Sequence, residues 1–461
     1  MRREPIRRLG ILASSASLLL ACASSSPRHE TTLPEAPTLS DARASVTARD
    51  EGPPPTDVDG YVARAIERSP AARAALAHWE AAHERVRASR RWPRPTLGYT
   101  ALVRPVHTRA GPMRQKVSFA WPLPQFGALS AAENAAESRV VTASHGFAAV
   151  ALTVRAQVAE AYWSLWGAKA RAAVLELQAE QLLTVAEVLR ARLATGATSL
   201  AAIQQLELRR ARLGDALDSM RSHQAHHADH LAELVELEGM PELAETPPAI
   251  RWPAESAAAL LESAAVRPKV SAELARAASF REEAAVHSAR RRPQATFRLE
   301  WSEVGPAVMA GSPNDGDDAL ALGLTVALPF DVGTDRAAER AAEADARAAE
   351  ASGEQVAREA RLEVLAALAE VQNTARRAEL HETTLEPQAI AAFESANARM
   401  ATEGDVTLTL LALRELLEVR LGHVDALAQH AVAWAALERA VGRPVQSRGE
   451  GAAMEGSTDD R

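Results

Sequence analysis

Apolar side chains recur at three- and four-residue intervals along most of this chain, which is the spacing of a helix with one buried face. Between Pro124 and Pro241 there is no proline, so no residue in this span lacks the backbone donor that a helix needs. The pattern predicts a helix from about Gly127 to Leu193, about 67 residues and roughly 100 Å long. Helices of this length are typical of coiled coils and elongated assemblies rather than of compact domains.

The helical pattern is interrupted once within this span, at Thr195-Gly196-Ala197-Thr198-Ser199. Gly196 suits the left-handed backbone that ends a helix, and Ser199 or Thr198 can cap the next one. A second helix is then expected to run to Gly239. The two helices form a hairpin whose turn lies far from every other chain break, so we expect this turn to be the tip of the molecule.

The chain repeats itself at a spacing of roughly 200 residues, which is too long for a solenoid unit. The matching segments are Arg91–Thr100 with Arg292–Glu300, Leu123–Gly127 with Leu328–Gly333, Ala194–Gly196 with Ala401–Gly404, and Arg212–Gly214 with Arg420–Gly422. Each half is therefore expected to contain strands followed by a long helical hairpin. In the second half Gly404 and Asp405 mark the corresponding tip.

Short strand-like segments precede each long hairpin. They are Thr96–Val103 and Gln115–Trp121, with a loop at Arg104–Arg114 between them, and Ala295–Trp301 and Leu320–Leu328. In the last segment Leu320, Leu322, Leu324 and Val326 alternate with small residues, as in a strand with one apolar face. Two hairpins with an exposed apolar face are not stable alone. Several copies closing into a barrel would remove the open edges, and a bilayer requires such closure.

Composition narrows the functional classes. Aromatic residues are only 4% of the chain and alanine is abundant, which suits closely packed long helices. The net charge of −8 argues against nucleic acid as a partner, because phosphate neutralisation needs a basic surface. After the N-terminus no run of about 18 uncharged apolar residues occurs, so no transmembrane helix is expected.

The N-terminus has the pattern of an export signal. Arginines at positions 2, 3, 7 and 8 precede the apolar segment Leu9–Leu20. Leu19-Leu20-Ala21-Cys22 resembles a bacterial lipobox, which implies that Cys22 is lipidated and anchored in outer-membrane lipid. The alternative is an ordinary signal peptide with an incidental cysteine. Cys22 is the single cysteine, so the chain forms no intramolecular disulfide.

These patterns predict the following organisation. Residues 1–21 are a lipoprotein signal peptide, 22–56 a flexible tether, 57–245 the first repeat, 246–256 a linker, 257–446 the second repeat and 447–461 a disordered tail.

From about Asp57 to Arg443 the chain resembles the outer-membrane efflux protein (TolC) family. The resemblance rests on Ser69-Pro70 and Arg267-Pro268 at the start of each half, Pro93–Leu97, Leu123–Gly127, Leu328–Gly333, and Leu385–Ala389 ahead of Arg399–Asp405. It implies a mainly α fold with a small membrane β-barrel. Three chains would each give four strands to a twelve-stranded barrel, and the helical hairpins would form a long periplasmic α-barrel.

The resemblance also implies a function and a set of partners. Such proteins are homotrimeric, passive exit ducts that dock on a periplasmic adaptor (membrane fusion) protein and an inner-membrane pump or type I secretion transporter. They need no cofactor. By position, Gly196, Thr198, Gly404 and Asp405 would form the periplasmic tip that meets the adaptor. Asp405 could contribute to an acidic constriction that favours cations, or it could simply cap a helix.

Four histidines, His223, His226, His227 and His230, lie on the second helix of the first hairpin. At 100° per residue they fall within an arc of roughly 100°, away from the apolar stripe of the same helix. Imidazoles at i and i+4 can share a transition metal. The alternative is a polar helix surface. The sequence therefore assigns no metal site, and these four residues are candidates.

Enzymatic interpretations lack support. The chain contains no G-x-x-x-x-G-K-[ST] phosphate loop and no G-x-S-x-G nucleophile elbow. A function in another class is a periplasmic coiled-coil adaptor or scaffold lipoprotein, but an adaptor should contain a single helical hairpin within β-rich domains. A metal-buffering lipoprotein would depend on the histidines alone. The sequence names neither the cargo nor the partner pump.

Overall fold

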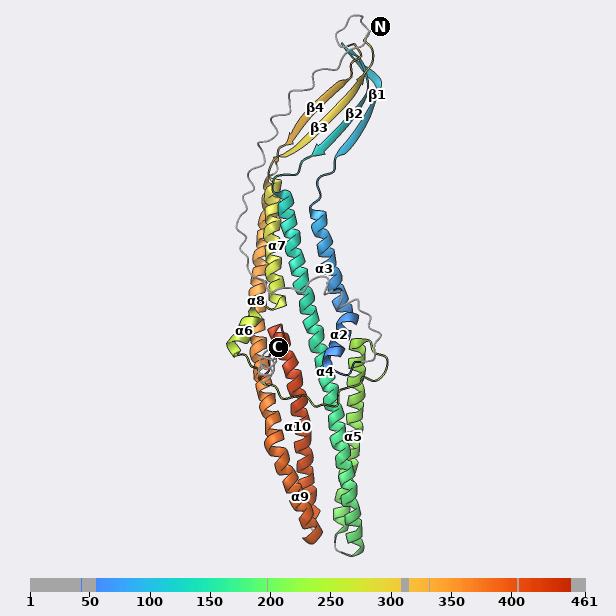
Figure 1. Ribbon diagram of the computed structural model, residues 1–461, viewed down its shortest axis with the longest axis vertical. Coiled ribbons are helices and arrows are strands. Elements are labelled where there is room, and N and C mark those ends of the chain that lie inside the picture. The colour runs from blue at the N-terminus through green and yellow to red at the C-terminus, as the bar shows by residue number, and fades with distance from the viewer. Residues whose placement is uncertain are drawn as a thin grey trace, which may run out of the picture. The chain divides into compact units, whose positions relative to one another are not determined.

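The structure is a computed structural model that describes residue 43 and residues 55–448, except residues 197, 308–314, 331 and 404–405. These residues belong to one compact unit, Glu35–Arg461. Figure 1 shows its long helices running side by side, with a sheet beyond one end of them. None of the described helices is long and apolar enough to cross a membrane.

The two halves have the same order of elements. The first contains α2 (Val58–Arg68), α3 (Pro70–Ser89), β1 (Thr96–Thr108), β2 (Gly111–Pro122), α4 (Ala128–Ala194) and α5 (Leu200–Val235). The second contains α6 (Ala257–Ala265), α7 (Pro268–Arg290), β3 (Gln294–Val304), β4 (Ala319–Ala327), α8 (Val332–Leu380), the π-helical turn η1 (His381–Leu385), α9 (Glu386–Glu403) and α10 (Val406–Val441). The long helix expected in the first half is confirmed, since α4 has 67 residues. The boundaries of the domains stay predictions.

Helix α4 is the central element of the helical layer. It packs against α3, α5, α7 and α10, while α8 packs against α7 and α10. The approach of α4 to α10 is close at Gly167, where a Cβ atom would lie 2.9 Å from the Cβ of Ala428. Small side chains therefore allow the two halves to meet, as the alanine-rich composition indicates.

Five apolar clusters hold the described helices together, and three of them are the largest. One joins α2, α4 and α5 around Tyr162, and a second joins α6, α8 and α10 around Trp434. The third contains Leu189 and Leu206 of the first hairpin together with Leu413 of the second. Because this third core takes residues from both hairpins, neither hairpin buries its apolar stripe alone.

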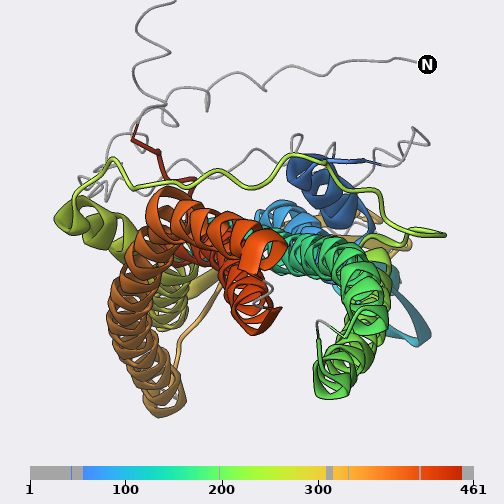
Figure 2. The same cartoon turned by 90° about the horizontal axis from the view of Figure 1, so that it is seen from below.

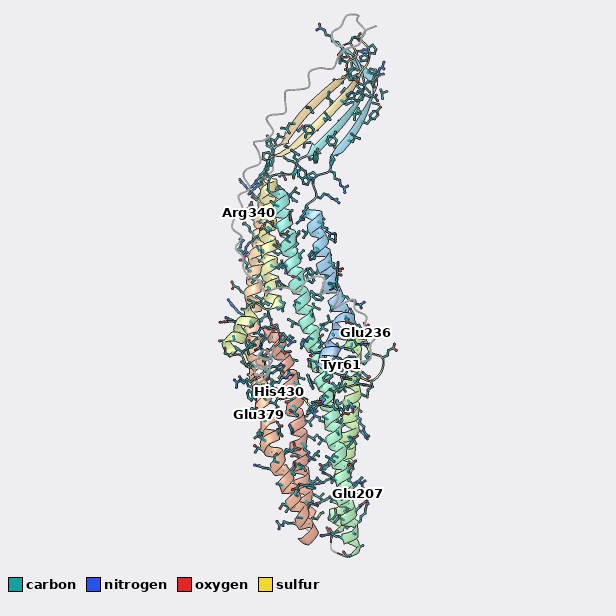
Figure 3. All side chains as sticks on the ribbon, viewed as in Figure 1. Tyr61, Glu207, Glu236, Arg340, Glu379 and His430 are labelled. Carbon is teal, nitrogen blue, oxygen red and sulfur yellow. The ribbon has the colours of Figure 1, made fainter. Side chains whose placement is uncertain are left out.

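The end of α5 is held by arginines from α2. Glu236, just after the helix, has φ of 47°, the left-handed conformation that often ends a helix. Arg64 donates to the Val235 carbonyl at 3.1 Å and Arg68 to the Glu236 carbonyl at 3.2 Å. Figure 3 places Tyr61 and Glu236 in this region. Cations are favourable beside the unpaired carbonyls of a helix C-terminus, so α2 is fixed to the first hairpin here.

The four strands form one antiparallel sheet in the order β1-β2-β3-β4. Strands β2 and β3 come from different halves and pair from Met113 with Val304 to Pro122 with Thr296. The prediction of a loop at Arg104–Arg114 is wrong, because this segment contains the end of β1, up to Thr108, and the start of β2, from Gly111. The register shifts between Ala101 and Val106, and such a bulge absorbs extra residues at an edge strand.

Candidate functional site

One face of the sheet is apolar across all four strands. The register places the following residues in rows on this face: Tyr99, Val117, Trp301 and Leu320; Leu97, Phe119, Leu299 and Leu322; Trp121, Phe297 and Leu324; Ala295 and Val326. Leu97 is 77% exposed and Leu322 is 72% exposed. This is a continuous exposed apolar surface, and a patch of this kind marks contact with another protein or with a membrane.

The opposite face carries polar and small side chains. Its rows are Thr100, Lys116, Ser302 and Ala319; Gly98, Ser118, Glu300 and Ala321; Thr96, Ala120, Arg298 and Gly323; Pro122, Thr296 and Thr325. Lys116 and Glu300 form an ion pair on this face. The sheet is thus two-sided over these rows, with an apolar face and a polar face; beyond them Gln115 and Glu303 lie on the same face as Tyr99.

Both edges of this sheet are open among the described strands. Strand β1 lies at one edge and β4 at the other, and every residue of β4 is exposed. Unpaired N–H and C=O groups along such edges are available to another strand. Among the described strands, the apolar face therefore lies between two edges that no strand of the same sheet covers.

The tip of the first hairpin has the predicted turn. Gly196 has φ of 71°, and a Cβ atom there would meet nothing within 4 Å. Ser199, rather than Thr198, caps α5, because its hydroxyl accepts the Ala202 N–H at 3.3 Å. The turn is thus determined by local backbone conformation and is open to contact. Cys22, Gly404 and Asp405 lie outside the described residues.

Near this tip the two hairpins are joined by side-chain contacts to backbone carbonyls. Arg192 of α4 donates to the Met400 carbonyl at 2.6 Å, and Arg209 of α5 donates to the Leu410 carbonyl. Gln178, which is buried, donates to the Leu413 carbonyl at 3.2 Å. All three contacts run from the first hairpin to the second, so movement of one hairpin at the tip would have to break them.

The second hairpin contains a π-helical turn that the sequence analysis did not predict. At η1 the Glu386 N–H bonds to the His381 carbonyl, five residues back. Pro387 follows directly and has no N–H, which removes a normal helical hydrogen bond. A proline inside a helical pattern was the signal that could have revealed this irregularity. Such π-helical turns occur frequently at functional sites.

Polar groups surround this π-turn. The Glu386 carboxylate accepts from Arg420 at 3.3 Å and lies 3.0 Å from His423 Nδ1. The His381 ring stacks on His423 with 6.3 Å between centroids. Burial lowers the pKa of His381, and the neighbouring His423 acts in the same direction. The neutral imidazole is therefore favoured beside the turn.

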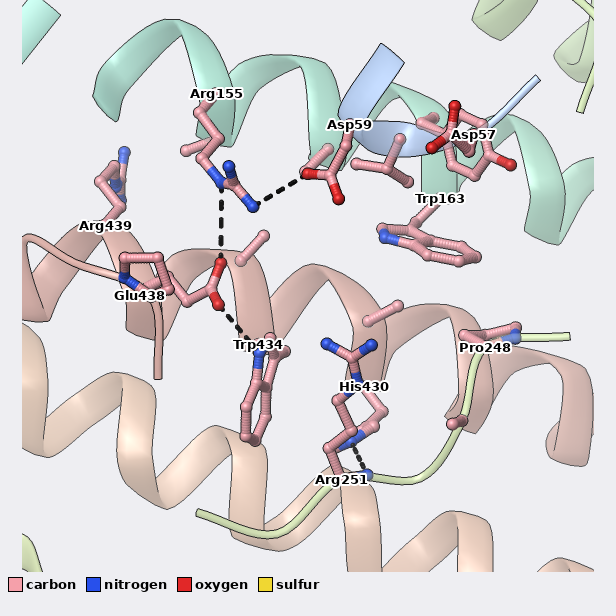
Figure 4. Close-up of a pocket in the computed structure, with 18 of the residues that line it drawn as sticks. Asp57, Asp59, Arg155, Trp163, Pro248, Arg251, His430, Trp434, Glu438 and Arg439 are labelled. Atoms are coloured by element: carbon pink, nitrogen blue, oxygen red, sulfur yellow. Dashed lines mark hydrogen bonds and ion pairs between the residues drawn. The ribbon is translucent and has the colours of Figure 1, made fainter. Parts of the chain in front are cut away.

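A cavity of about 520 Å³ lies between α4, α10 and the segment that joins α5 to α6 (Figure 4). Arg155 bridges its walls, with 3.1 Å to Asp59 and 3.8 Å to Glu438. His430 accepts the Arg251 N–H at 2.8 Å, and burial lowers the pKa of His430. Because these charged and polar groups pair with each other, we interpret the cavity as a structural joint.

The four candidate histidines lie on α5, and the structure separates them into two groups. His223 and His227 line a groove of about 590 Å³ that also contains Glu370, Asp425 and Gln429. His226 and His230 are exposed beside it. The rings of His226 and His227 are 5.6 Å apart. Among the described residues no three His, Cys, Asp or Glu side chains converge into a metal site.

Comparison with known proteins gives a family and a fold. Residues 61–226 match the family model of the outer membrane efflux protein. No curated protein sequence matches the chain.

Solved structures match over both halves. The chain is similar to CusC at 18% identity and a TM-score of 0.68, with 84% of this chain and 92% of that chain covered. It is similar to VceC from Vibrio cholerae at 20% identity and a TM-score of 0.64, covering 84% and 96%. It is also similar to CmeC from Campylobacter jejuni at 14% identity and a TM-score of 0.64, covering 93% of each chain. At these identities the likeness shows a common fold.

The family model matches residues in the first half, and the solved structures match the fold of both halves. The predicted resemblance is therefore confirmed, and the family consists of channels rather than enzymes. Residues 61–226 thus resemble the outer membrane efflux proteins, and the chain has the TolC-like fold, mostly helical with one four-stranded sheet.

Proposed function

We propose that three copies of this chain form a passive exit duct of a tripartite efflux or type I secretion system. The two-sided sheet with open edges carries the proposal. Three sheets of four strands would close into a twelve-stranded barrel in which every edge is paired. Its apolar face would then contact lipid and its polar face would line water, as membrane barrels require.

The arrangement of the helices supports the same assembly. In Figure 2 the helices lie along an arc, and the segment from α5 to α6 crosses the convex side. Three such arcs would complete a tube with the concave faces inward. The tube walls would be the long hairpins, and the inner space would need no cofactor, since passage through it is passive.

The family resemblance and the exposed turn at Gly196 support a set of partners. We propose that residues 1–21 are removed, that Cys22 is lipidated, and that the protein is anchored in the outer membrane and extends into the periplasm. Gly196 and Thr198, with Gly404 and Asp405, would then meet a periplasmic adaptor, which links the duct to an inner-membrane pump.

The test is detergent extraction of the outer-membrane fraction followed by mass determination and reconstitution into planar bilayers. We expect a trimer that conducts ions. A monomer or dimer retained on the membrane only by its lipid, with no conductance, would overturn the duct and favour a scaffold lipoprotein. Mass determination and conductance are measured on one preparation, so a protein that assembles but does not conduct is distinguished from one that does not assemble.

A further inference from the structure

The histidines of α5 form two interleaved pairs. His223 with His227 and His226 with His230 are each separated by four residues, so each pair shares one face of the helix. These four are among 13 histidines in 461 residues. Such spacing on a continuous helix brings two imidazoles to one ion, as in helical zinc motifs.

His223 and His227 face the concave side of the helical layer. On α10, His430, Trp434 and Glu438 line the cavity beneath the segment that joins α5 to α6. Asp425 and Gln429 line the groove of His223 and His227 instead. At 100° per residue these two sets lie on roughly opposite sides of α10. Since the joining segment crosses the convex side, the groove opens on the concave side.

The same groove contains acidic side chains. Carboxylates of Glu370 and Asp425 line it, and Asp425 is paired with Arg171, which also lines it. His223 is exposed and His227 is half-buried, so both rings can change rotamer. Imidazole binds metals in its neutral form.

We propose that His223/His227 and His226/His230 are two chelating pairs that bind divalent transition-metal ions, with Cu²⁺ bound more tightly than Ni²⁺ or Zn²⁺. Imidazole ligands prefer these ions over Mg²⁺ and Ca²⁺. Each pair supplies two ligands, and water completes the coordination, since no third protein group converges on either pair among the described residues. The position of His223 and His227 inside a duct rests on the proposed function, whereas the binding of ions does not.

The test uses the full chain purified in detergent through a tag without histidine. Equilibrium dialysis counts bound Cu²⁺, and electron paramagnetic resonance detects nitrogen ligation. Three variants are compared with the wild type: His223→Gln/His227→Gln, His226→Gln/His230→Gln and all four together. The matched control is His78→Gln/His83→Gln, because both residues are exposed on α3 but five positions apart.

We expect two Cu²⁺ ions per chain above the background of the fourfold variant. Each double variant should lose one ion, and the control should keep both. The proposal is overturned if the fourfold variant binds as many ions as the wild type, or if Mg²⁺ competes as well as Zn²⁺. Helix content and Tm without metal should match the wild type, because the replaced rings are largely exposed.

Conductance and mass are measured on the same samples, so the two proposals can fail separately. If the protein is a conducting trimer and the fourfold variant retains all bound Cu²⁺, the proposal of metal-binding pairs fails and the proposal of a duct stands. If the variants lose bound ions but the wild type forms no trimer and conducts no ions, the proposal of a duct fails and the proposal of metal-binding pairs stands.

Discussion

The two halves of the molecule share one plan but differ in the middle of the long hairpin. Helix α4 runs without interruption through 67 residues, whereas its counterpart is divided into α8, η1 and α9. The difference lies at one place, where Pro387 follows the π-turn His381–Leu385. Duplication therefore preserves the order of elements, while the backbone hydrogen bonds of the second hairpin are locally rearranged.

This difference makes the second hairpin the natural place for bending. A π-turn and a proline are recognised causes of kinks, and neither occurs in helices α4 and α5 as the structure describes them. The contacts of Arg192, Arg209 and Gln178 run from the straight hairpin to the irregular one. We expect any bend of the second hairpin to occur at the π-turn, with these contacts holding the two hairpins together near the tip.

The largest expected effect comes from the core that both hairpins share. Leu413→Ala and Leu189→Ala should each lower the free energy of unfolding by about 2–5 kcal/mol, because both side chains are fully buried. Thermal unfolding in detergent measures this loss. The control is Leu411→Ala, since Leu411 is 52% exposed. A loss confined to one half would show that the hairpins are independent.

The two hairpins of the sheet should respond alike to a charge on the apolar face. Leu324→Arg in β4 and Phe119→Arg in β2 should each cost about 2–4 kcal/mol in a bilayer and reduce trimer recovery. Thr325→Arg and Ser118→Arg, one residue away on the polar face, are the matched controls. Equal recovery for Leu324→Arg and Thr325→Arg would contradict the assignment of the faces.

At the tip, Gly196→Val should lower the free energy of unfolding by about 1–2 kcal/mol, because the left-handed backbone conformation is strained for a β-branched residue. Space is not the cause, as nothing lies near the missing Cβ. We expect weaker cross-linking to the adaptor, and the same for Gly404→Val if the second tip repeats the first. Gly214 lies in regular helix with open space around it, so Gly214→Ala should instead stabilise the folded protein. Unchanged cross-linking in both valine variants would remove these turns from the docking surface.

Mild acid should destabilise both halves. Burial lowers the pKa of His145 and His227 in the first half and of His381 and His430 in the second. The folded protein then binds fewer protons than the unfolded chain, so stability decreases as pH falls below about 6.5, by at most about 1.4 kcal/mol per group and pH unit.

Unfolding of His430→Gln followed between pH 7.5 and 5.5 checks this expectation. Glutamine can accept the Arg251 N–H as His430 does but does not titrate, so the decrease of Tm with acid should be smaller than in the wild type. His78→Gln, exposed on α3, should leave the slope unchanged. An identical slope in all three proteins would show that burial of His430 does not govern the acid response.

Sequence by itself determined the features that depend on neighbouring residues. The proline-free apolar pattern predicted α4, Gly196 predicted the left-handed turn, and alternation from Leu320 to Val326 predicted the face of β4. These succeed because helix period, glycine conformation and strand alternation are local properties of the chain.

Tertiary structure alone decided the features that depend on distant residues. The pairing of β2 with β3 merges two hairpins into one apolar face, and a bulge extends β1 through the segment predicted as a loop. The side of the helical layer that His223 and His227 occupy depends on the packing of α5, α4 and α10. Strand register and helix rotation are fixed by long-range contacts, and these are absent from any short window of sequence.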